Sequence, residues 1–217
     1  YAMRFERKAS KKTSAVFATD GLVVREMLGD EQLMRYGVLT VDEAHERSVH
    51  TDVLLGLAKR TQSKRPLKLI LMSATLDIDS LKNYFDDCAV VKVPGRLHAV
   101  DVFYTVDALD DYHEACATCC AQLHADKTCK GDVLVFMPGQ EEIASCVAML
   151  EERLSGVVVV PLYAALSKEK QLEAFAPAPS GKRKFIVSTT IAETSVTVQG
   201  VRHVIDPGWA KNRGCDA

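Results

Sequence analysis

Short apolar runs alternate with segments of helical periodicity along most of this 217-residue chain. The runs are rich in valine, isoleucine and leucine without strict alternation, which is typical of strands covered on both faces in a parallel sheet. Strands are predicted at 14–18, 38–41, 67–72, 90–93, 132–137, 157–162, 184–188 and 201–205. This rhythm predicts an α/β protein built on parallel sheets.

Helices are predicted between these strands, at 20–28, 51–60, 78–85, 112–124, 141–154 and from Ser167 to about residue 175. Thr19 stands where a side chain can cap the first helix, and Ser167 where one can cap the last. The rhythm is interrupted after Pro94 and Gly95 and then restarts. We therefore expect a first domain at 1–94, a linker at 95–106 and a second domain at 107–217.

The composition excludes several classes of protein. Apolar residues make up 47% and charged residues 26% of the chain, which excludes wholesale disorder. The net charge of -2 excludes a strongly basic coat, so any nucleic acid must be held by local patches. The sequence contains no run of about 18 uncharged apolar residues, the length that spanning a membrane requires. The chain does not begin with Met and lacks a signal-peptide region, and we expect it to be a piece of a longer protein.

Seven cysteines in a chain without a secretory signal favour a reducing, intracellular compartment, nuclear or cytoplasmic. The one suggestive cluster has helical spacing and comprises His113, Cys116, Cys119, Cys120 and His124. A zinc site needs four ligands in a tetrahedron, which one helix face seldom provides. Small buried core cysteines are the alternative interpretation and the favoured one.

Ligands of open parallel sheets bind at the carboxyl ends of the strands, and nearly every predicted strand here ends in polar residues. These segments are 19–21, 42–45, 73–75, 138–142, 189–195 and 206–208. Asp42 and Glu43 directly follow the run 38–41. Such an aspartate can hold nucleotide-bound Mg²⁺ through water, and its neighbouring glutamate can orient an attacking water. Alternatively, the pair is simply the acidic start of a helix.

An ordered set of motifs resembles the DEAH-box helicases over essentially the whole chain. They are Thr-Asp-Gly at 19–21 (motif Ib), Asp-Glu-Ala-His-Glu-Arg at 42–47 (II), Ser-Ala-Thr at 73–75 (III), Phe-Met-Pro-Gly-Gln-Glu-Glu-Ile at 136–143 (IV) and Ser-Thr-Thr-Ile-Ala-Glu-Thr-Ser-Val-Thr at 188–197 (V). The resemblance implies two RecA-like parallel-sheet domains, both incomplete here. It also implies ATP hydrolysis coupled to translocation along single-stranded RNA, with an activating protein cofactor as a further partner.

The resemblance carries over roles position by position. Asp42 and Glu43 match the residues for Mg²⁺ and the attacking water, and His45 matches the histidine that links the nucleotide site to the second domain. The motif that couples the ATP state to domain closure is matched by Ser73, Ala74 and Thr75. Residues near ATP are matched by Phe175, which would stack on adenine, and by Ser195 and Thr197. Residues near RNA are matched by Arg4, Phe5, Thr19, Asp20, Gly21, Gly139, Gln140, Thr189 and Thr190.

Several of these positions allow a second interpretation. A phenylalanine at a helix end, such as Phe175, is commonly a core residue. Thr190 stands where the family usually has Asn, and Gln199 where an acidic residue is common. The basic run 182–184 could contact RNA, although exposed lysine runs are usually solvated surface.

Two motifs that the resemblance would lead us to expect are not found in the sequence. A phosphate-cradling loop reads G-x-x-x-x-G-K-S/T, and the only Gly-Lys pair, at 181–182, has Ala176 and Arg183 at the other key positions. The arginine-rich motif VI is not found either. We therefore expect an ATP-dependent RNA helicase whose isolated 217 residues are inactive. The alternatives are a nucleic-acid-binding or scaffold remnant without ATPase activity, and a DNA-directed helicase.

Overall fold

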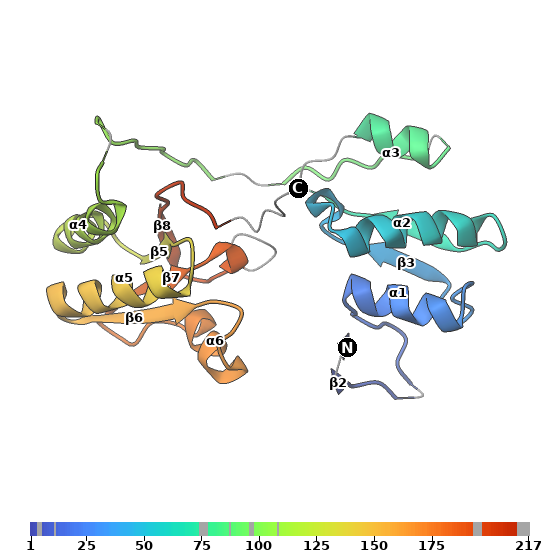
Figure 1. Cartoon of the computed structure of the whole chain (residues 1–217), viewed down its shortest axis with the longest axis horizontal. Coiled ribbons are helices and arrows are strands. Elements are labelled where there is room, and N and C mark those ends of the chain that lie inside the picture. Colours follow the sequence, from blue (N-terminus) through green and yellow to red (C-terminus); the bar gives the residue numbers. More distant parts are fainter. Residues whose placement is uncertain are drawn as a thin grey trace, which may run out of the picture. The chain divides into compact units, whose positions relative to one another are not determined.

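The structure is a computed structural model that describes residues 1–3, 6–10, 12–73, 78–86, 88–95, 98–107, 109–192 and 197–211. The chain divides into two units, residues 1–98 and 99–217, which Figure 1 colours from blue to green and from green to red. Among the described residues, no helix is both long and apolar enough to cross a membrane.

In the part that the structure describes, the first unit contains two small sheets and three α-helices. Strand β1 (Ala2–Met3) pairs antiparallel with β2 (Glu6–Arg7), and β3 (Val38–Val41) pairs in parallel with β4 (Lys68–Leu71). The helical elements are α1 (Asp20–Gly29), η1 (Ala44–Glu46), α2 (Val49–Gln62) and α3 (Ile78–Tyr84). Helices α1 and α2 pack on each other through a core that includes Met27, Val41 and Leu54.

The β3–β4 pair is covered on one face rather than on both. Leu39 and Val41 face the core, while Val38 and Ile70 are each 49% exposed. The expectation of strands covered on both faces is therefore wrong for this pair. In the described part of the chain, α1 and α2 supply the buried cluster on one side, and the outward side chains have no second layer.

The second unit is a four-stranded parallel sheet in the order β6-β7-β5-β8. Its strands are β5 (Asp132–Phe136), β6 (Val157–Leu162), β7 (Arg183–Ser188) and β8 (Val201–Ile205). Its helical elements are α4 (Tyr112–Ala125), α5 (Gln140–Arg153), α6 (Lys168–Phe175) and η2 (Thr190–Ala192). The sheet confirms the predicted α/β class and carries the long Val/Ile/Leu runs at its centre.

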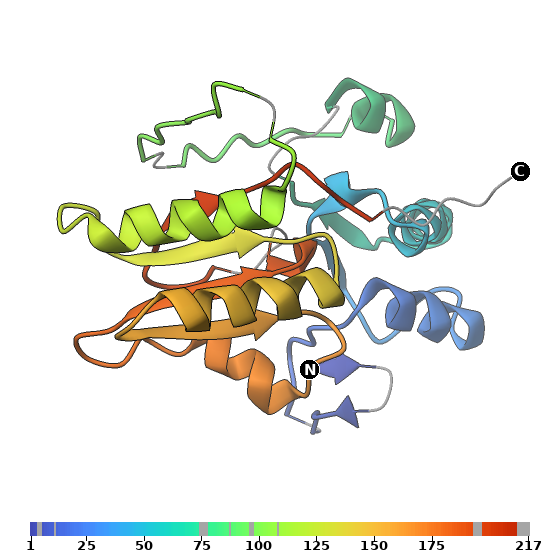
Figure 2. The same ribbon diagram turned by 60° about the vertical axis from the view of Figure 1, so that its left-hand side comes forward.

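Alternate side chains of the central strands point to opposite faces of the sheet and pack into two different cores. Phe185 and Val187 pack with α4 and α5, which run side by side in Figure 2, whereas Leu134 and Ile186 pack with Ala174 of α6. Helix α6 therefore covers the opposite face of the sheet from α4 and α5, and strands buried on both faces are what the apolar runs predict.

The cysteines of α4 and α5 are core residues. Cys116, Cys120 and Cys146 are buried among apolar side chains, and burial raises the pKa of Cys116 to about 11 and that of Cys146 to about 12. Within the described ranges, no three His, Cys, Asp or Glu side chains come together as a metal site. The structure thus favours the packing interpretation of this cluster.

Two predicted strands are wrong. The segment 14–18 contributes only an isolated bridge between Ala18 and Ala2. The segment 90–93 has no regular structure, and Val91 and Val93 are 82% and 85% exposed. Apolar β-branched residues favour a strand only when a neighbouring strand pairs with them, and no described strand does so here.

Candidate functional site

The loops that follow β3 and β4 are joined by backbone hydrogen bonds. The Met72 amide donates to Val41 O at 2.9 Å, and the Ala44 amide donates back to Met72 O at 3.1 Å. These bonds extend the parallel ladder beyond the ends of both strands. They place the Asp-Glu-Ala-His loop at 42–45 directly beside Ser73, as two adjacent parallel strands require.

The side chains of Glu43 and Ser73 both approach the same ring nitrogen of His45. His45 Nδ1 lies 3.0 Å from Ser73 Oγ and 3.3 Å from Glu43 Oε2, and all three side chains are partly buried. Asp42 is exposed beside them, with Oδ1 accepting from the Glu43 amide at 2.9 Å. The structure thus brings together Glu43, His45 and Ser73, which belong to two different motifs.

The backbone of this loop is strained on both sides of η1. Glu43 has φ 49° and ψ 39°, and Arg47 has φ 50° and ψ 38°, which is left-handed backbone that longer side chains seldom adopt. Such conformations concentrate at functional sites, where the surrounding structure holds them in place. At Arg47 the side chain helps to keep the backbone in this conformation, because its guanidinium donates two hydrogen bonds to the Asp52 carboxylate, at 2.7 and 3.1 Å.

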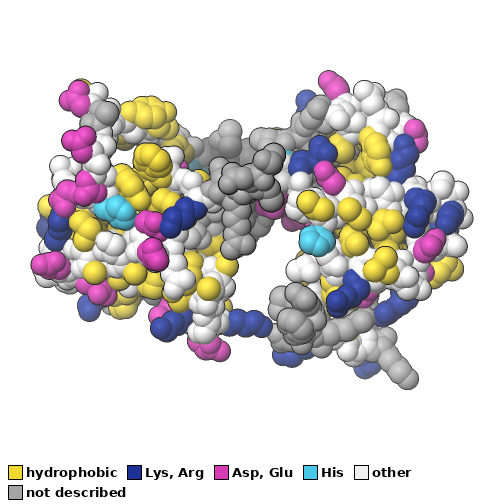
Figure 3. Space-filling model, in the orientation of Figure 1, with side chains coloured by type: hydrophobic (Ala, Val, Ile, Leu, Met, Phe, Trp, Pro, Cys, Tyr) yellow, Lys and Arg dark blue, Asp and Glu magenta, His cyan; other side chains and the backbone are white. Residues whose placement is uncertain are grey.

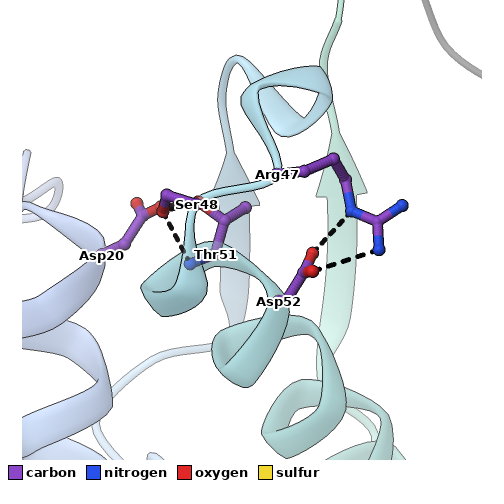
Figure 4. Close-up of polar contacts among 5 residues, drawn as sticks. All are labelled: Asp20, Arg47, Ser48, Thr51 and Asp52. Carbon is purple, nitrogen blue, oxygen red and sulfur yellow. Dashed lines mark hydrogen bonds and ion pairs between the residues drawn. The ribbon is translucent and has the colours of Figure 1, made fainter. Parts of the chain in front are cut away.

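A chain of oxygens links the first helix to the DEAH loop (Figure 4). Ser48 caps α2 by accepting from the Thr51 amide at 3.1 Å, and its hydroxyl lies 2.7 Å from Thr51 Oγ1. Thr51 Oγ1 in turn donates to Asp20 Oδ2 at 2.5 Å. Asp20 opens α1, so this link couples motif Ib to the start of α2. Sequence reasoning missed Thr51 because it predicted a helix that begins at residue 51, although a serine such as Ser48 is a typical N-cap residue.

A surface groove of about 560 Å³ lies beside this link and is lined by Thr19, Gly21, Leu22, Arg25 and His50. A Cβ added at Gly21 would lie 3.1 Å from the His50 ring, so the helix start and the imidazole are in close contact. Thr19 is the N-cap residue of α1, but its side chain makes no capping hydrogen bond, contrary to the prediction. The groove combines a helix N-terminus with Arg25, which suits a phosphate.

In the second unit, two predicted RNA-contacting segments lie next to each other. Gly139 and Gln140 follow β5, Thr189 and Thr190 follow β7, and these two strands are adjacent and parallel. The Met137 amide donates to Ser188 O at 2.8 Å, which continues the ladder past the strand ends. Gln140 and Thr190 are exposed at this edge.

An ion pair lies directly over Gly139. Lys211 Nζ is 2.7 Å from Glu142 Oε1, and the hydrogen bond from Lys211 lowers the pKa of Glu142. A Cβ at Gly139 would lie 2.7 Å from Glu142 Oε2 and 3.0 Å from Lys211 Nζ. The absence of a side chain at position 139 is what lets this ion pair close over the start of α5.

Phe175 ends α6 and is partly buried against a core cluster that also receives Ile191 and Val198. The cluster therefore joins Phe175 to the segment of motif V. Thr197 is exposed beside Val198. Both interpretations of Phe175 remain compatible with this placement, because part of the residue packs in the core and part is accessible.

The basic run 182–184 is not the surface patch that the sequence favoured. Lys184 is only 2% exposed, and its ammonium donates to backbone carbonyls of the α6 end. The Arg183 guanidinium donates to Leu123 O, which leaves Lys182 as the exposed member of the run. On the face seen in Figure 3, the Lys and Arg side chains of the described residues are scattered among Asp and Glu.

Five of the predicted site residues lie outside the described residues. They are Arg4, Phe5, Ala74, Thr75 and Ser195. The roles of these residues stay predictions.

The chain matches known helicases over almost all of its length. A family model described as helicase conserved C-terminal domain matches residues 114–214. The pre-mRNA-splicing factor ATP-dependent RNA helicase prp22 of Schizosaccharomyces pombe is 45% identical over 219 residues, covering 97% of this chain and 19% of that protein. The ATP-dependent RNA helicase DHX33 of Mus musculus is 41% identical over 224 residues, covering 97% of this chain and 32% of that protein.

A solved structure agrees with these relatives. The Escherichia coli DEAH/RHA helicase HrpB superposes with a TM-score of 0.82 at 36% identity, covering 95% of this chain and 27% of that one. The chain therefore spans between about a fifth and a third of the length of the proteins it matches.

Proposed function

We propose that this chain is the part of a DEAH-box ATP-dependent RNA helicase that couples ATP hydrolysis to movement along single-stranded RNA, and its similarity to known RNA helicases supports this. The observation that carries the proposal is the meeting of Glu43, His45 and Ser73 at one imidazole nitrogen. A change in the position of Glu43 at the γ-phosphate would thereby be transmitted through His45 to Ser73, which follows the neighbouring strand.

Asp42 and Glu43 fit the chemistry of Mg²⁺ and water. Asp42 is an exposed carboxylate at the carboxyl end of β3, and Mg²⁺ prefers such oxygen ligands while keeping several of its waters. The bound ion would neutralise charge on the phosphates of ATP. Glu43 would orient the attacking water or accept its proton, and His45 would hold the Glu43 carboxylate in place.

The nucleotide base and RNA would be held by residues of both units. Phe175 would stack on adenine, and Ser195 and Thr197 would lie near ATP. The RNA backbone would follow the groove at Thr19, Asp20 and Gly21 and the strand ends at Gly139, Gln140, Thr189 and Thr190. Arg4 and Phe5 would extend the contact, and Ala74 and Thr75 would act with Ser73. We place the first domain at 1–94, the linker at 95–106 and the second domain at 107–217, and we expect a protein activator as a further partner.

The competing function is that of a nucleic-acid-binding or scaffold remnant without ATPase activity.

Glu43→Gln in the full-length gene product tests the proposal. Loss of a general base should lower RNA-stimulated ATP turnover by about 10²-fold or more while ATP binding is retained. Glu46→Gln is the matched control, because Glu46 is exposed three residues further along the same loop. Turnover within about threefold of wild type for Glu43→Gln would remove Glu43 from the mechanism. No turnover in the parent protein would favour the remnant, and stronger stimulation by DNA than by RNA would make the enzyme DNA-directed.

A further inference from the structure

Lys184 is a buried lysine that reaches across to the end of α6. Its side chain is 2% exposed, and Nζ donates to Ala174 O at 2.8 Å and to Ala176 O at 2.5 Å. These two carbonyls belong to the residues immediately before and after Phe175. One ammonium group therefore holds the peptide units on both sides of this phenylalanine.

The helix end attracts the positive charge of Lys184, whereas burial makes this charge costly. The last carbonyls of a helix lack partners within the helix and favour a positive charge. A buried ammonium is costly unless it is hydrogen-bonded, and burial lowers the pKa of Lys184. Two carbonyl acceptors and the nearby Asp132, whose charge acts in the opposite direction on this pKa, offset the cost.

Asp132 connects Lys184 to the turn that precedes β8. Its Oδ1 accepts from the Lys184 amide at 2.9 Å, and its own amide donates to Gly200 O at 2.9 Å. Gly200 has φ +91°, and a Cβ there would lie 2.8 Å from Asp132 Oδ2. The network thus runs from the end of α6 to a turn three residues beyond Thr197, the other described position expected near ATP.

We propose that Lys184 is a positioning residue for nucleotide binding, which fixes the Phe175 ring in the orientation that stacks on the base. The inference rests on the proposed function, in which Phe175 is the stacking residue. A helix of eight residues has a readily frayed end. Because the backbone is already fixed on both sides of Phe175, less conformational entropy is lost when the base binds.

A double-mutant cycle in the full-length gene product tests this role. The variants are Lys184→Met, Phe175→Ala and the pair, with Lys182→Met as the control, because Lys182 is an exposed lysine of the same run. We expect Lys184→Met to raise the KM for ATP about 3- to 10-fold, the range of one aromatic stacking contact, with kcat nearly unchanged. In the Phe175→Ala background, Lys184→Met should leave KM unchanged, because both residues act through one contact.

The outcomes separate the two proposals. If Phe175→Ala raises KM but Lys184→Met does not, or if the two effects multiply, Lys184 does not act through Phe175 and the inference is overturned. If Phe175→Ala leaves KM unchanged while Glu43→Gln still abolishes turnover, base stacking at Phe175 is wrong, and the inference falls with it while the ATPase stands. Thermal unfolding monitors the fold, and Lys184→Leu, which also removes the ammonium donor, replaces Met in the cycle if Lys184→Met does not fold.

Discussion

Thr51 Oγ1 donates a hydrogen bond to Asp20 Oδ2 at 2.5 Å, across 31 residues of sequence. Asp20 is the middle residue of the Thr-Asp-Gly motif, and Thr51 lies in the first turn of the helix that follows the DEAH loop. The bond therefore joins a segment proposed to bind RNA to a segment proposed to act on ATP. The bond is thus a direct connection, within the first unit, between these two proposed binding segments.

Thr51→Val should break this route while preserving the shape of the side chain. Loss of a hydrogen bond to a charged acceptor costs about 1.5–3 kcal/mol, and we expect a loss of stability of that size for the first unit. RNA binding should weaken, because the carboxylate of Asp20 is left without its donor. Denaturant unfolding and RNA titration measure the two effects. Thr51→Ser, which keeps the hydroxyl, should match wild type in both, and equal defects in the Val and Ser variants would assign the effect to packing.

Ser73→Ala should lower RNA unwinding more than ATP turnover. The substitution removes Oγ from His45 Nδ1 but leaves the Glu43–His45 contact at 3.3 Å intact. Parallel assays of RNA-stimulated ATPase and strand separation distinguish the two activities. An equal loss of both would mean that Ser73 belongs to the hydrolytic step instead.

The thiols should react in an order set by burial. Cys119 is exposed, whereas Cys116, Cys120 and Cys146 are buried, and desolvation by burial raises the pKa of each buried thiol. Because the thiolate is the reactive form, we expect rapid alkylation at Cys119 and slow alkylation at the other three until the second unit is denatured. Mass-spectrometric mapping of iodoacetamide adducts checks the order. Rapid modification of Cys120 in the folded protein would contradict the packed core.

The Glu142–Lys211 ion pair should make the second unit sensitive to acid. Its hydrogen bond lowers the pKa of Glu142 below the ordinary value of 4.5, so its stabilisation is fully present above that pH. It is lost as the pH falls through the lower pKa of the folded state. The free energy of unfolding should fall more steeply below about pH 4.5 for wild type than for Glu142→Gln or Lys211→Met. Identical pH profiles for the three proteins would show that the ion pair adds nothing to stability.

The sequence predicted the second sheet better than the first unit. The runs at 157–162 and 201–205 form β6 and β8 with the predicted limits, because each has a parallel neighbour that pairs with it. The runs at 14–18 and 90–93 have similar residues but no ladder partner in the described chain, and local propensity alone did not make them strands.

Site residues that belong to a sequence motif were predicted individually. Residues whose role depends only on three-dimensional contacts were not predicted. Glu43, His45 and Ser73 were selected together, although their meeting at Nδ1 depends on the register of β3 and β4. Lys184 was grouped with its charged neighbours as surface. Its two-residue spacing from Ile186, which packs with Ala174, places Lys184 on the face of β7 that α6 covers.

The central place of β5 in its sheet has a consequence for hydrogen exchange. Strand β5 pairs with β7 on one side and β8 on the other, so its amides are covered by strands at both edges. Residues such as Val133 and Val135 are also fully buried. Exchange of these amides with deuterium requires opening of the whole unit, so their rates report its global stability. Slowed exchange on adding ATP would then register binding to the second unit, with no need for catalytic turnover.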